Sequence, residues 1–315
     1  MSGPRITILE NIHDAGVQKM ETFARVEWRV GLDRENSIRE ASDSDAIIIK
    51  SVTKVDDAFL NAVKNLRVIA RAGSGTENID LEAARRRGIQ VITVPLGNVV
   101  SAAEFTIAMM LMLARNIPRA QTAVANGDFR RHLLTGHDLG ALRVGLVGLG
   151  NVGKAVAARL AGFGCTVQAF DPHPGDVDDF LGRGGALLPS LDELLRTSDV
   201  VSLHVRQTAQ TEKLIGREEL ALMPQDSILI NTARGSVVDD QALLDALNSG
   251  HLSAAGVDVL SPEPPFDAAP GTSNYTHALL NHPKILVTPH MAASTIESQK
   301  TISLVLAKEL HSALS

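Results

Sequence analysis

A glycine-rich turn between a β-branched run and a helix-like run constrains the fold of this chain more than any other feature. The run RVGLV is followed at once by GLGNVG, residues 148–153, and then by KAVAARLAGFG. In this context Gly148 permits a tight turn, Gly150 lets a bound group approach the backbone, and Gly153 allows close packing of the helix on the strand. The N-terminus of such a helix attracts negative charge, so the pattern predicts a βαβ unit that can hold a pyrophosphate.

Short β-branched runs alternate with helix-like segments on both sides of this turn. Such alternation is typical of α/β folds with parallel sheets. A first series of runs covers residues 6–9, 46–50, 67–70 and 89–94, and a second covers residues 143–149, 165–170, 200–205, 227–232, 253–259 and 284–289. We therefore expect two α/β domains with a cleft between them, and a long, mostly buried helix over residues 98–119 between the two series.

The composition excludes several classes of protein. A length of 315 residues, with 44% hydrophobic and 21% charged residues, suffices for two domains with sizeable cores. The net charge of −6 and the scattered cations argue against a nucleic-acid partner. Cys165 is the only cysteine, so we expect neither an intramolecular disulfide nor a cysteine-based metal cluster, and we assign no metal site. The start MSGPRITILE lacks a secretory leader, and the most apolar stretch, 105–113, is too short to span a bilayer, which predicts a cytoplasmic protein without a membrane partner.

An acidic residue follows the glycine motif at about the sequence distance at which dinucleotide-binding units carry an acid. Asp171 ends the next strand-like run, about eighteen positions beyond Gly153. A carboxylate there can accept hydrogen bonds from both ribose hydroxyls of an adenosine, and it repels a 2′-phosphate. We therefore expect the cofactor to be NAD rather than NADP.

Three polar residues in the last third of the chain indicate chemistry on a small acid. Arg234 lies in NTARGSVVDD, Glu263 in DVLSPEPP and His290 in VTPH. An arginine can bind a carboxylate, an imidazole can move a proton, and a carboxylate can hold that imidazole. Beside a dinucleotide site, the trio suggests reduction of a 2-oxo acid. Taken singly, each residue also has an ordinary explanation, as a surface arginine, a solvated loop carboxylate or a strand-end cap.

From about residue 46 onward, the chain resembles the D-isomer-specific 2-hydroxyacid dehydrogenases, and within them most closely the catalytic part of the D-3-phosphoglycerate dehydrogenases. The motifs that carry the resemblance are KSVTKV (50–55), RAGSGTENID (71–80), VPLGNVVSAAE (94–104), GLGNVG, NTARGSVVDDQALLDAL (231–247), GVDVLSPEPP (256–265) and TPHMAAST (288–295). The resemblance implies two Rossmann-like doubly wound parallel-sheet domains. The substrate domain, 1–97 and 286–315, is discontinuous and ends in a crossing helix over 295–314, and the NAD-binding domain, 98–285, is inserted into it. The resemblance also implies a homodimer formed through the cofactor domain.

The resemblance assigns roles to the trio and to a set of cofactor positions. His290 matches the family's acid/base histidine, Glu263 its carboxylate partner, and Arg234 the arginine that holds the oxo acid against the nicotinamide. The positions that match cofactor contacts are Gly148, Gly150, Asn151, Val152, Gly153, Asp171, His204, Thr232, Ala233 and Asp258. Asp258 is expected near the nicotinamide amide.

The resemblance defines less well which tail group the substrate carries at the end away from its reacting carbon. The backbone of Ser74 and Gly75 matches the family's carboxylate-binding loop, and Arg71 and Arg131 match arginines that bind a phosphate tail. Lys50 stands where an arginine is usual, which keeps the charge but loses the bidentate geometry. We therefore expect a small anionic hydroxy or oxo acid, with 3-phosphoglycerate the best single choice; a sulfonate, phosphonate or second carboxylate would satisfy the same charges.

Several alternatives stay open. A hydroxypyruvate or glyoxylate reductase, or a sulfolactate-type dehydrogenase, would use the same trio, and an NAD-sensing corepressor would share the fold. Arg206, at a position usually held by proline, could loosen the preference for NAD. The segment 270–283 looks longer than usual, contains the only tyrosine, Tyr275, and could cover the cleft or contact a partner subunit. The chain stops after one crossing helix, so a regulatory domain that binds serine is not expected.

Overall fold

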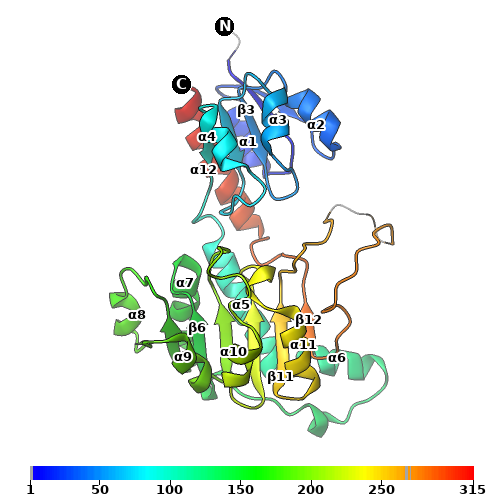
Figure 1. The fold of residues 1–315 in the computed structure, drawn as a ribbon, viewed down its shortest axis with the longest axis vertical. Helices are drawn as coiled ribbons and strands as arrows, with labels where there is room; N and C mark the ends of the chain where they lie inside the picture. The colour runs from blue at the N-terminus through cyan, green and yellow to red at the C-terminus, as the bar shows by residue number, and fades with distance from the viewer. Residues whose placement is uncertain (1–2, 267–268, 270) are drawn as a thin grey trace. The chain divides into compact units, whose positions relative to one another are not determined.

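The computed structural model describes residues 3–266, 269 and 271–315. It forms two compact units, one of Met1–Val99 with Ser294–Ser315 and the other of Val100–Ala293 (Figure 1). Each unit is built on its own parallel sheet with helices on both faces. The expected fold class, two doubly wound parallel-sheet domains, is therefore confirmed.

The first unit contains a five-stranded sheet in the order β2-β1-β3-β4-β5, in which every pair is parallel. Its strands are β1 (Arg5–Ile8), β2 (Arg25–Trp28), β3 (Ala46–Ile49), β4 (Val68–Arg71) and β5 (Gln90–Ile92). Its helices are α1 (Asp14–Met20), α2 (Arg34–Ala41), α3 (Asp57–Ala62), α4 (Leu81–Arg86) and α12 (Ile296–Leu314). The central strand β3 is buried throughout, and because side chains alternate along a strand, Ile48 enters one core cluster while Ile47 and Ile49 enter the other.

Helix α12 belongs to the first unit although it lies far along the chain from the rest of it. It begins after Thr295, whose hydroxyl accepts from the backbone N–H of Ser298 at 3.1 Å. It packs closely against α1, because Gly16 has no side chain: a Cβ added there would lie 1.9 Å from Ser303 Oγ. That hydroxyl donates to the carbonyl of His13 at 2.6 Å and fixes the contact.

The second unit contains a seven-stranded parallel sheet in the order β12-β11-β10-β9-β6-β7-β8. Its strands are β6 (Arg143–Val147), β7 (Thr166–Phe170), β8 (Ala186–Leu187), β9 (Val200–Leu203), β10 (Ser227–Asn231), β11 (Leu252–Val257) and β12 (Ile285–Val287). Its helices are α5 (Val99–Ala114), α6 (Ile117–Ala125), α7 (Asn151–Leu160), α8 (Asp178–Gly182), α9 (Leu191–Thr197), α10 (Arg217–Leu222) and α11 (Asp240–Asn248). Short 3₁₀ helices are η1 (Arg131–Leu134), η2 (Leu139–Ala141), η3 (Ala161–Phe163) and η4 (Gly235–Val237).

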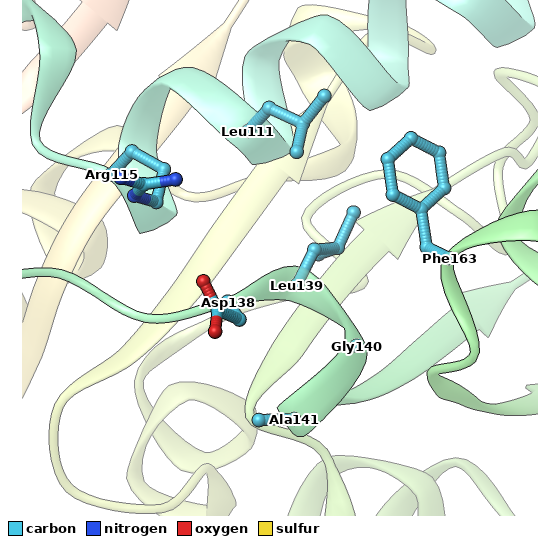
Figure 2. Close-up of a pocket in the computed structure, with 7 residues that line it drawn as sticks. All are labelled: Leu111, Arg115, Asp138, Leu139, Gly140, Ala141 and Phe163. Atoms are coloured by element: carbon cyan, nitrogen blue, oxygen red, sulfur yellow. The ribbon is translucent and has the colours of Figure 1, made fainter.

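An open cavity of about 600 Å³ lies where the C-terminal end of α5 meets η2 and η3 (Figure 2). Its lining residues are Leu111, Arg115, Asp138, Leu139, Gly140, Ala141 and Phe163. The 3₁₀ helix η3, which contributes to this cavity, follows the C-terminal end of α7, whereas the glycine turn precedes its N-terminal end. At about 1.5 Å per residue, the 10 residues of α7 separate the cavity from the glycine turn by roughly 15 Å. None of the site residues expected from the sequence lines it.

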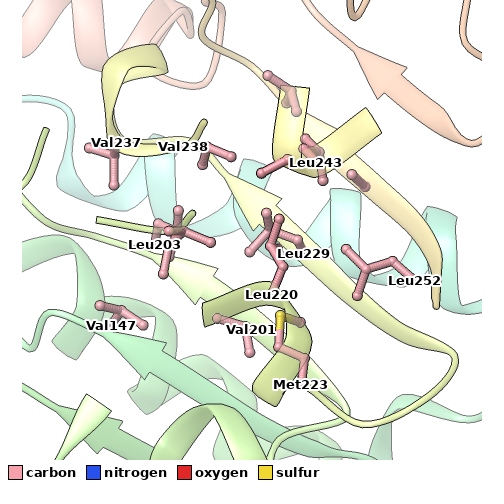
Figure 3. Packing of buried hydrophobic residues seen from close by; sticks show 14 of the residues in the cluster. Val147, Val201, Leu203, Leu220, Met223, Leu229, Val237, Val238, Leu243 and Leu252 are labelled. Carbon is pink, nitrogen blue, oxygen red and sulfur yellow. The ribbon is translucent and has the colours of Figure 1, made fainter. Parts of the chain in front are cut away.

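The core of the second unit consists of two apolar clusters, one on each face of the sheet. Figure 3 shows the first of them, in which Leu203 and Leu229 from the strands lie among residues such as Leu220 of α10 and Leu243 of α11. All four side chains are at most 1% exposed. The second cluster contains the buried face of α5, including Met109 and Met110. This dense packing holds the carboxyl ends of the strands in fixed positions.

Two expectations about the elements were wrong. The helix expected over 98–119 ends at Ala114, because Asn116 adopts a left-handed backbone (φ 55°) and caps the new helix α6, which has Pro118 in its first turn. The edge strands β2 and β8 were also missed, since β2 carries no apolar run and β8 is only two residues long. No single helix among the described residues is long and apolar enough to cross a membrane; α5 and α6, bent by 59°, meet the length and composition criteria only as a pair.

Candidate active site

The three glycines of the turn between β6 and α7 differ in what a side chain at each position would meet. Gly148 has φ 98°, and a Cβ there would lie 2.7 Å from the carbonyl oxygen of His204. A Cβ on Gly153 would lie 2.2 Å from the carbonyl oxygen of Gly148. Gly150 has open space where its Cβ would be. The first and third glycines therefore close the turn, while the second leaves room beside the backbone.

The start of α7 fits a diphosphate. The N-terminal capping residue of α7 is Gly150, which makes no side-chain hydrogen bond to the helix. The first N–H groups of α7, including those of Asn151 and Val152, therefore receive no side-chain cap from it. Such N–H groups, with the positive end of the helix dipole, bind phosphate oxygens. The residues present in this turn thus match what a dinucleotide requires.

Asp171 lies directly beside this turn. It follows β7, and its two carboxylate oxygens accept from the backbone N–H groups of Leu149 at 2.7 Å and His173 at 2.8 Å. A carboxylate has about four acceptor positions, so two positions can still receive ribose hydroxyls. The structure therefore places this acid within one hydrogen bond of the glycine turn, and its contact with the ribose stays a prediction.

The remaining expected cofactor positions lie at the carboxyl ends of neighbouring strands. His204 follows β9, and its Nε2 contacts Ser202 Oγ at 3.0 Å. Burial lowers the pKa of His204 to about 4, so the ring is neutral near pH 7. Thr232 follows β10 and contacts Thr106 Oγ1 at 2.8 Å, while the buried Ala233 donates its N–H to Asn231 Oδ1 at 3.0 Å.

The structure brings Glu263 and His290 together. Nδ1 of His290 lies 2.6 Å from Oε1 of Glu263, and the two side chains are 31% and 32% exposed. With Nδ1–H donated to the carboxylate, Nε2 is the ring atom that can exchange a proton with a bound molecule. The ring of Phe266 contacts the imidazole edge-on at 6.1 Å between centroids. This pair has the geometry of a histidine oriented for acid/base chemistry.

Arg234 is placed by a loop that packs beside Glu263's own segment. Asn231, 1% exposed, donates from Nδ2 to the carbonyl of Arg234 at 2.9 Å, and Arg234 donates to the carbonyl of Ala233 at 2.7 Å. Gly235 follows, and a Cβ on it would lie 2.3 Å from the backbone carbon of Leu260. The strands β10, β11 and β12 are adjacent and parallel, so the segments that carry the trio all leave the same edge of the sheet.

Asp258 has a role that the sequence did not reveal. Its carboxylate is 1% exposed and accepts from Thr288 Oγ1 at 2.5 Å and from the N–H groups of Met291 and Ala292, both at 2.9 Å. Its carbonyl oxygen accepts from the N–H of His290 at 2.7 Å. His290 itself has φ 53°, a strained value for a non-glycine residue. Asp258 therefore holds the turn that carries His290, whereas its expected contact with a nicotinamide amide stays a prediction.

In the first unit, Arg71 is the last residue of β4, Ser74 and Gly75 follow it, and Lys50 follows the adjacent strand β3. Asn78 joins the two loops, because its Nδ2 donates to the carbonyls of Lys50 at 3.0 Å and Thr53 at 2.7 Å. Arg71 donates to Asn78 Oδ1 at 3.3 Å, and its side chain is only 11% exposed. In the second unit Arg131 is exposed in η1. The structure thus groups four of the five expected substrate residues at one sheet edge.

Comparison with known proteins identifies the family. Residues 107–292 match the family described as D-isomer specific 2-hydroxyacid dehydrogenase, NAD binding domain. This match covers more than half of the chain, so the protein belongs to that family and carries its NAD binding domain. The expected family and the expected cofactor, NAD, are therefore confirmed.

Particular relatives have more specific names. The D-3-phosphoglycerate dehydrogenase of Archaeoglobus fulgidus is 38% identical over 307 residues, covering 97% of this chain and 56% of the relative. That of Methanocaldococcus jannaschii is 35% identical over 311 residues, covering 98% and 57%. The chain thus spans somewhat more than half the length of these curated relatives.

Solved structures of similar length share the fold. A protein from Thermus thermophilus aligns with a TM-score of 0.86 and 34% identity, over 98% of this chain and 96% of its own. The D-lactate dehydrogenase of Aquifex aeolicus, complexed with NAD and lactic acid, aligns with a TM-score of 0.86 and 28% identity, over 98% and 94%. Another similar structure is a glyoxylate reductase, with a TM-score of 0.84 and 28% identity, so similar structures include enzymes with different named substrates.

Proposed function

We propose that this protein is an NAD-dependent D-2-hydroxyacid dehydrogenase acting on a small anionic acid, with 3-phosphoglycerate and its 2-oxo product as the best pair. The observation that carries the proposal is the 2.6 Å contact between His290 Nδ1 and Glu263 Oε1, in the same unit as the NAD fingerprint. NAD supplies the hydride acceptor when it is bound. The protein's own residues must then bind the acid, orient it and move one proton.

The proton step follows from the orientation of the imidazole. Glu263 receives Nδ1–H, and Nε2 is the atom that removes the hydroxyl proton during oxidation or protonates the carbonyl oxygen during reduction. The carboxylate stays in contact with the ring at 2.6 Å and offsets the positive charge that the ring carries after it has taken the proton. Arg234 supplies a planar pair of N–H donors that suits the substrate carboxylate and orients its C2 carbon.

The substrate class is supported by positive charge and by the named relatives. Lys50 and Arg71 lie together at one edge of the first unit's sheet, and a phosphate tail needs such cations. Two relatives that align with nearly all of the chain are D-3-phosphoglycerate dehydrogenases. Arg71 also contacts Asn78 and Glu77, so some of its N–H donors are used within its own loop. We therefore propose a substrate with an anionic tail, and phosphate is the tail group that we favour.

The proposal is tested by the rate of NADH consumption with 3-phosphohydroxypyruvate, hydroxypyruvate, glyoxylate and 3-sulfopyruvate, each repeated with NADPH. The phosphorylated acid should give the highest kcat/KM, and NADH should be preferred. A higher kcat/KM for sulfopyruvate or an acid without a charged tail would keep the reaction class and overturn the phosphate assignment. No turnover of any acid would overturn the enzymatic proposal in favour of NAD sensing.

We also propose that the protein forms a homodimer through the segment that follows α5. Helix α6 buries none of its residues within the chain, although its Ile117 and Val124 are apolar. The following residues include Phe129, which is 74% exposed, and Leu133, which is 50% exposed. A second copy of the chain would cover these side chains. Sedimentation should give a dimer, and Phe129→Glu should shift it towards monomer; a monomeric wild-type protein would refute the proposal.

A further inference from the structure

The segment that contains the only tyrosine is anchored in the second unit. Leu279 is 2% exposed and belongs to the apolar cluster beneath α10 and α11, and Tyr275 and Leu280 pack against the same cluster. Pro270, the first residue of the segment expected to cover a cleft or contact a partner, lies outside the described residues. Residues 275–280 therefore have a fixed position within their own unit.

This segment holds the backbone immediately before Glu263. The hydroxyl of Tyr275 donates to the carbonyl of Pro262 at 2.7 Å, and Nε2 of His277 donates to the carbonyl of Ser261 at 3.2 Å. Among the residues that the structure describes, no backbone–backbone hydrogen bond involves residues 261–265. The two side chains thus supply hydrogen bonds to a stretch that receives none from any backbone group the structure describes.

The protonation of both donors suits this role. Nδ1 of His277 accepts the N–H of Leu279 at 3.3 Å, so the proton lies on Nε2, which also faces Asp240 Oδ2 at 3.2 Å. The His277 side chain is only 6% exposed. Burial, together with the carboxylates of Asp240 and Glu263, raises the pKa of Tyr275, so its hydroxyl keeps its proton.

We propose that Tyr275 and His277 are positioning residues that hold the Ser261–Pro262 backbone so that Glu263 meets His290. The proposal rests on the proposed function, because the orientation of His290 matters only if this ring moves the proton. Both donors act on the two residues that precede Glu263, and small displacements of a positioning group reduce the rate of the step it supports. Neither residue needs to touch the substrate.

Matched variants test the proposal. Tyr275→Phe removes only the hydroxyl, and His277→Gln removes the ring. His282→Gln is the control, because His282 lies in the same segment and likewise accepts a backbone N–H, that of Lys284 at 3.2 Å, but its Nε2 contacts Asn248 at 3.3 Å. We expect the first two variants to lower kcat for 2-oxo acid reduction by roughly 2- to 10-fold, the value of one hydrogen bond, and the control to match the wild type.

A double-mutant cycle separates positioning from a general structural effect. Tyr275→Phe should lower kcat in the wild-type background and have no effect when Glu263 is already replaced by Gln. The melting temperature of Tyr275→Phe should fall by no more than about 4 °C, as expected for one lost hydrogen bond, and the NADH dissociation constant should stay unchanged. An equal loss in both backgrounds, or an unchanged kcat in the wild-type background, would overturn the proposal.

A spectroscopic readout keeps the test independent of turnover. The Nδ1–H proton of His290, hydrogen-bonded to a carboxylate at 2.6 Å, should resonate far downfield, and it should move upfield in Tyr275→Phe but not in His282→Gln. An unmoved resonance in Tyr275→Phe would overturn the positioning role. In contrast, a wild-type protein that turns over no acid, or a Glu263→Gln variant with unchanged kcat, would count against the proposed function instead.

Discussion

Replacing Asp258 by Asn should loosen the turn that carries His290. The aspartate is 1% exposed and receives three hydrogen bonds, from the Thr288 hydroxyl and from the N–H groups of Met291 and Ala292. Asparagine has nearly the same shape but only one carbonyl oxygen, so its NH₂ group must face at least one of these donors. The substitution therefore tests the hydrogen bonds with little change in packing.

The magnitude follows from the geometry of the Asp258 carboxylate. A hydrogen bond to a charged group contributes about 1.5–3 kcal/mol, and a buried N–H left unsatisfied costs about 1–3 kcal/mol. These contributions overlap, so we expect the free energy of unfolding of the second unit to fall by about 2–4 kcal/mol. Since His290 also donates its N–H to the carbonyl of Asp258, kcat should fall as well.

Urea denaturation followed by circular dichroism measures this loss. Asp226→Asn is a suitable control, because Asp226 is exposed and has φ 66°, which asparagine also tolerates. The control should stay within about 0.5 kcal/mol of the wild type, as is usual for surface substitutions. A loss for Asp258→Asn no larger than that of the control would refute the conclusion that the carboxylate holds the turn.

Three further predictions concern the trio, the cofactor and pH. His290→Ala should lower kcat by roughly 10²- to 10⁴-fold, whereas NADH binding by fluorescence titration should persist; lost NADH binding would mean that the histidine is structural. Asp171→Ala should raise kcat/KM with NADPH relative to NADH, and an unchanged ratio would remove the ribose assignment. Because the folded protein keeps His204 neutral, with a pKa of about 4 against about 6.5 in the unfolded chain, the unfolded state binds more protons between these values. Stability should therefore fall as the pH drops from about 6.5 towards 4, and His204→Asn should flatten that part of the pH profile in denaturation experiments.

The sequence predicted the elements that carry strong local patterns. The buried run at Ala46–Ile49 is a strand because all four of its residues are apolar and three are β-branched. The edge strand Arg25–Trp28 has no such pattern: its buried residue is Glu27, which is paired with Arg5 at 3.0 Å and Arg25 at 2.9 Å. A strand that is stabilised mainly by its neighbour and by ion pairs gives no hydrophobic signal, so its position could not be predicted from the sequence.

The site shows the same limit at a finer scale. The glycine motif and the trio are visible because each lies within a short run of residues whose order is informative. The hydrogen bonds of Asp258 join residues about thirty positions apart, and those of Tyr275 reach back across thirteen. Such contacts depend on how two loops leave the sheet, and single-sequence patterns do not contain that information. The structure therefore added the residues that hold the site, while motifs identified the residues expected to carry out the reaction.

The close contact between Gly16 and Ser303 has a consequence for how the chain is made. The first unit's core includes Leu306 and Leu310 of α12, both 0% exposed, and these residues are synthesised only after residues 100–293. At about 5–20 residues per second, the interval is on the order of 10–40 s. During that interval the sheet face that α12 packs against, including that of β4, stays without its partner helix, whereas the second unit can complete its own core. We expect the inserted unit to be the first part of a nascent chain to resist protease.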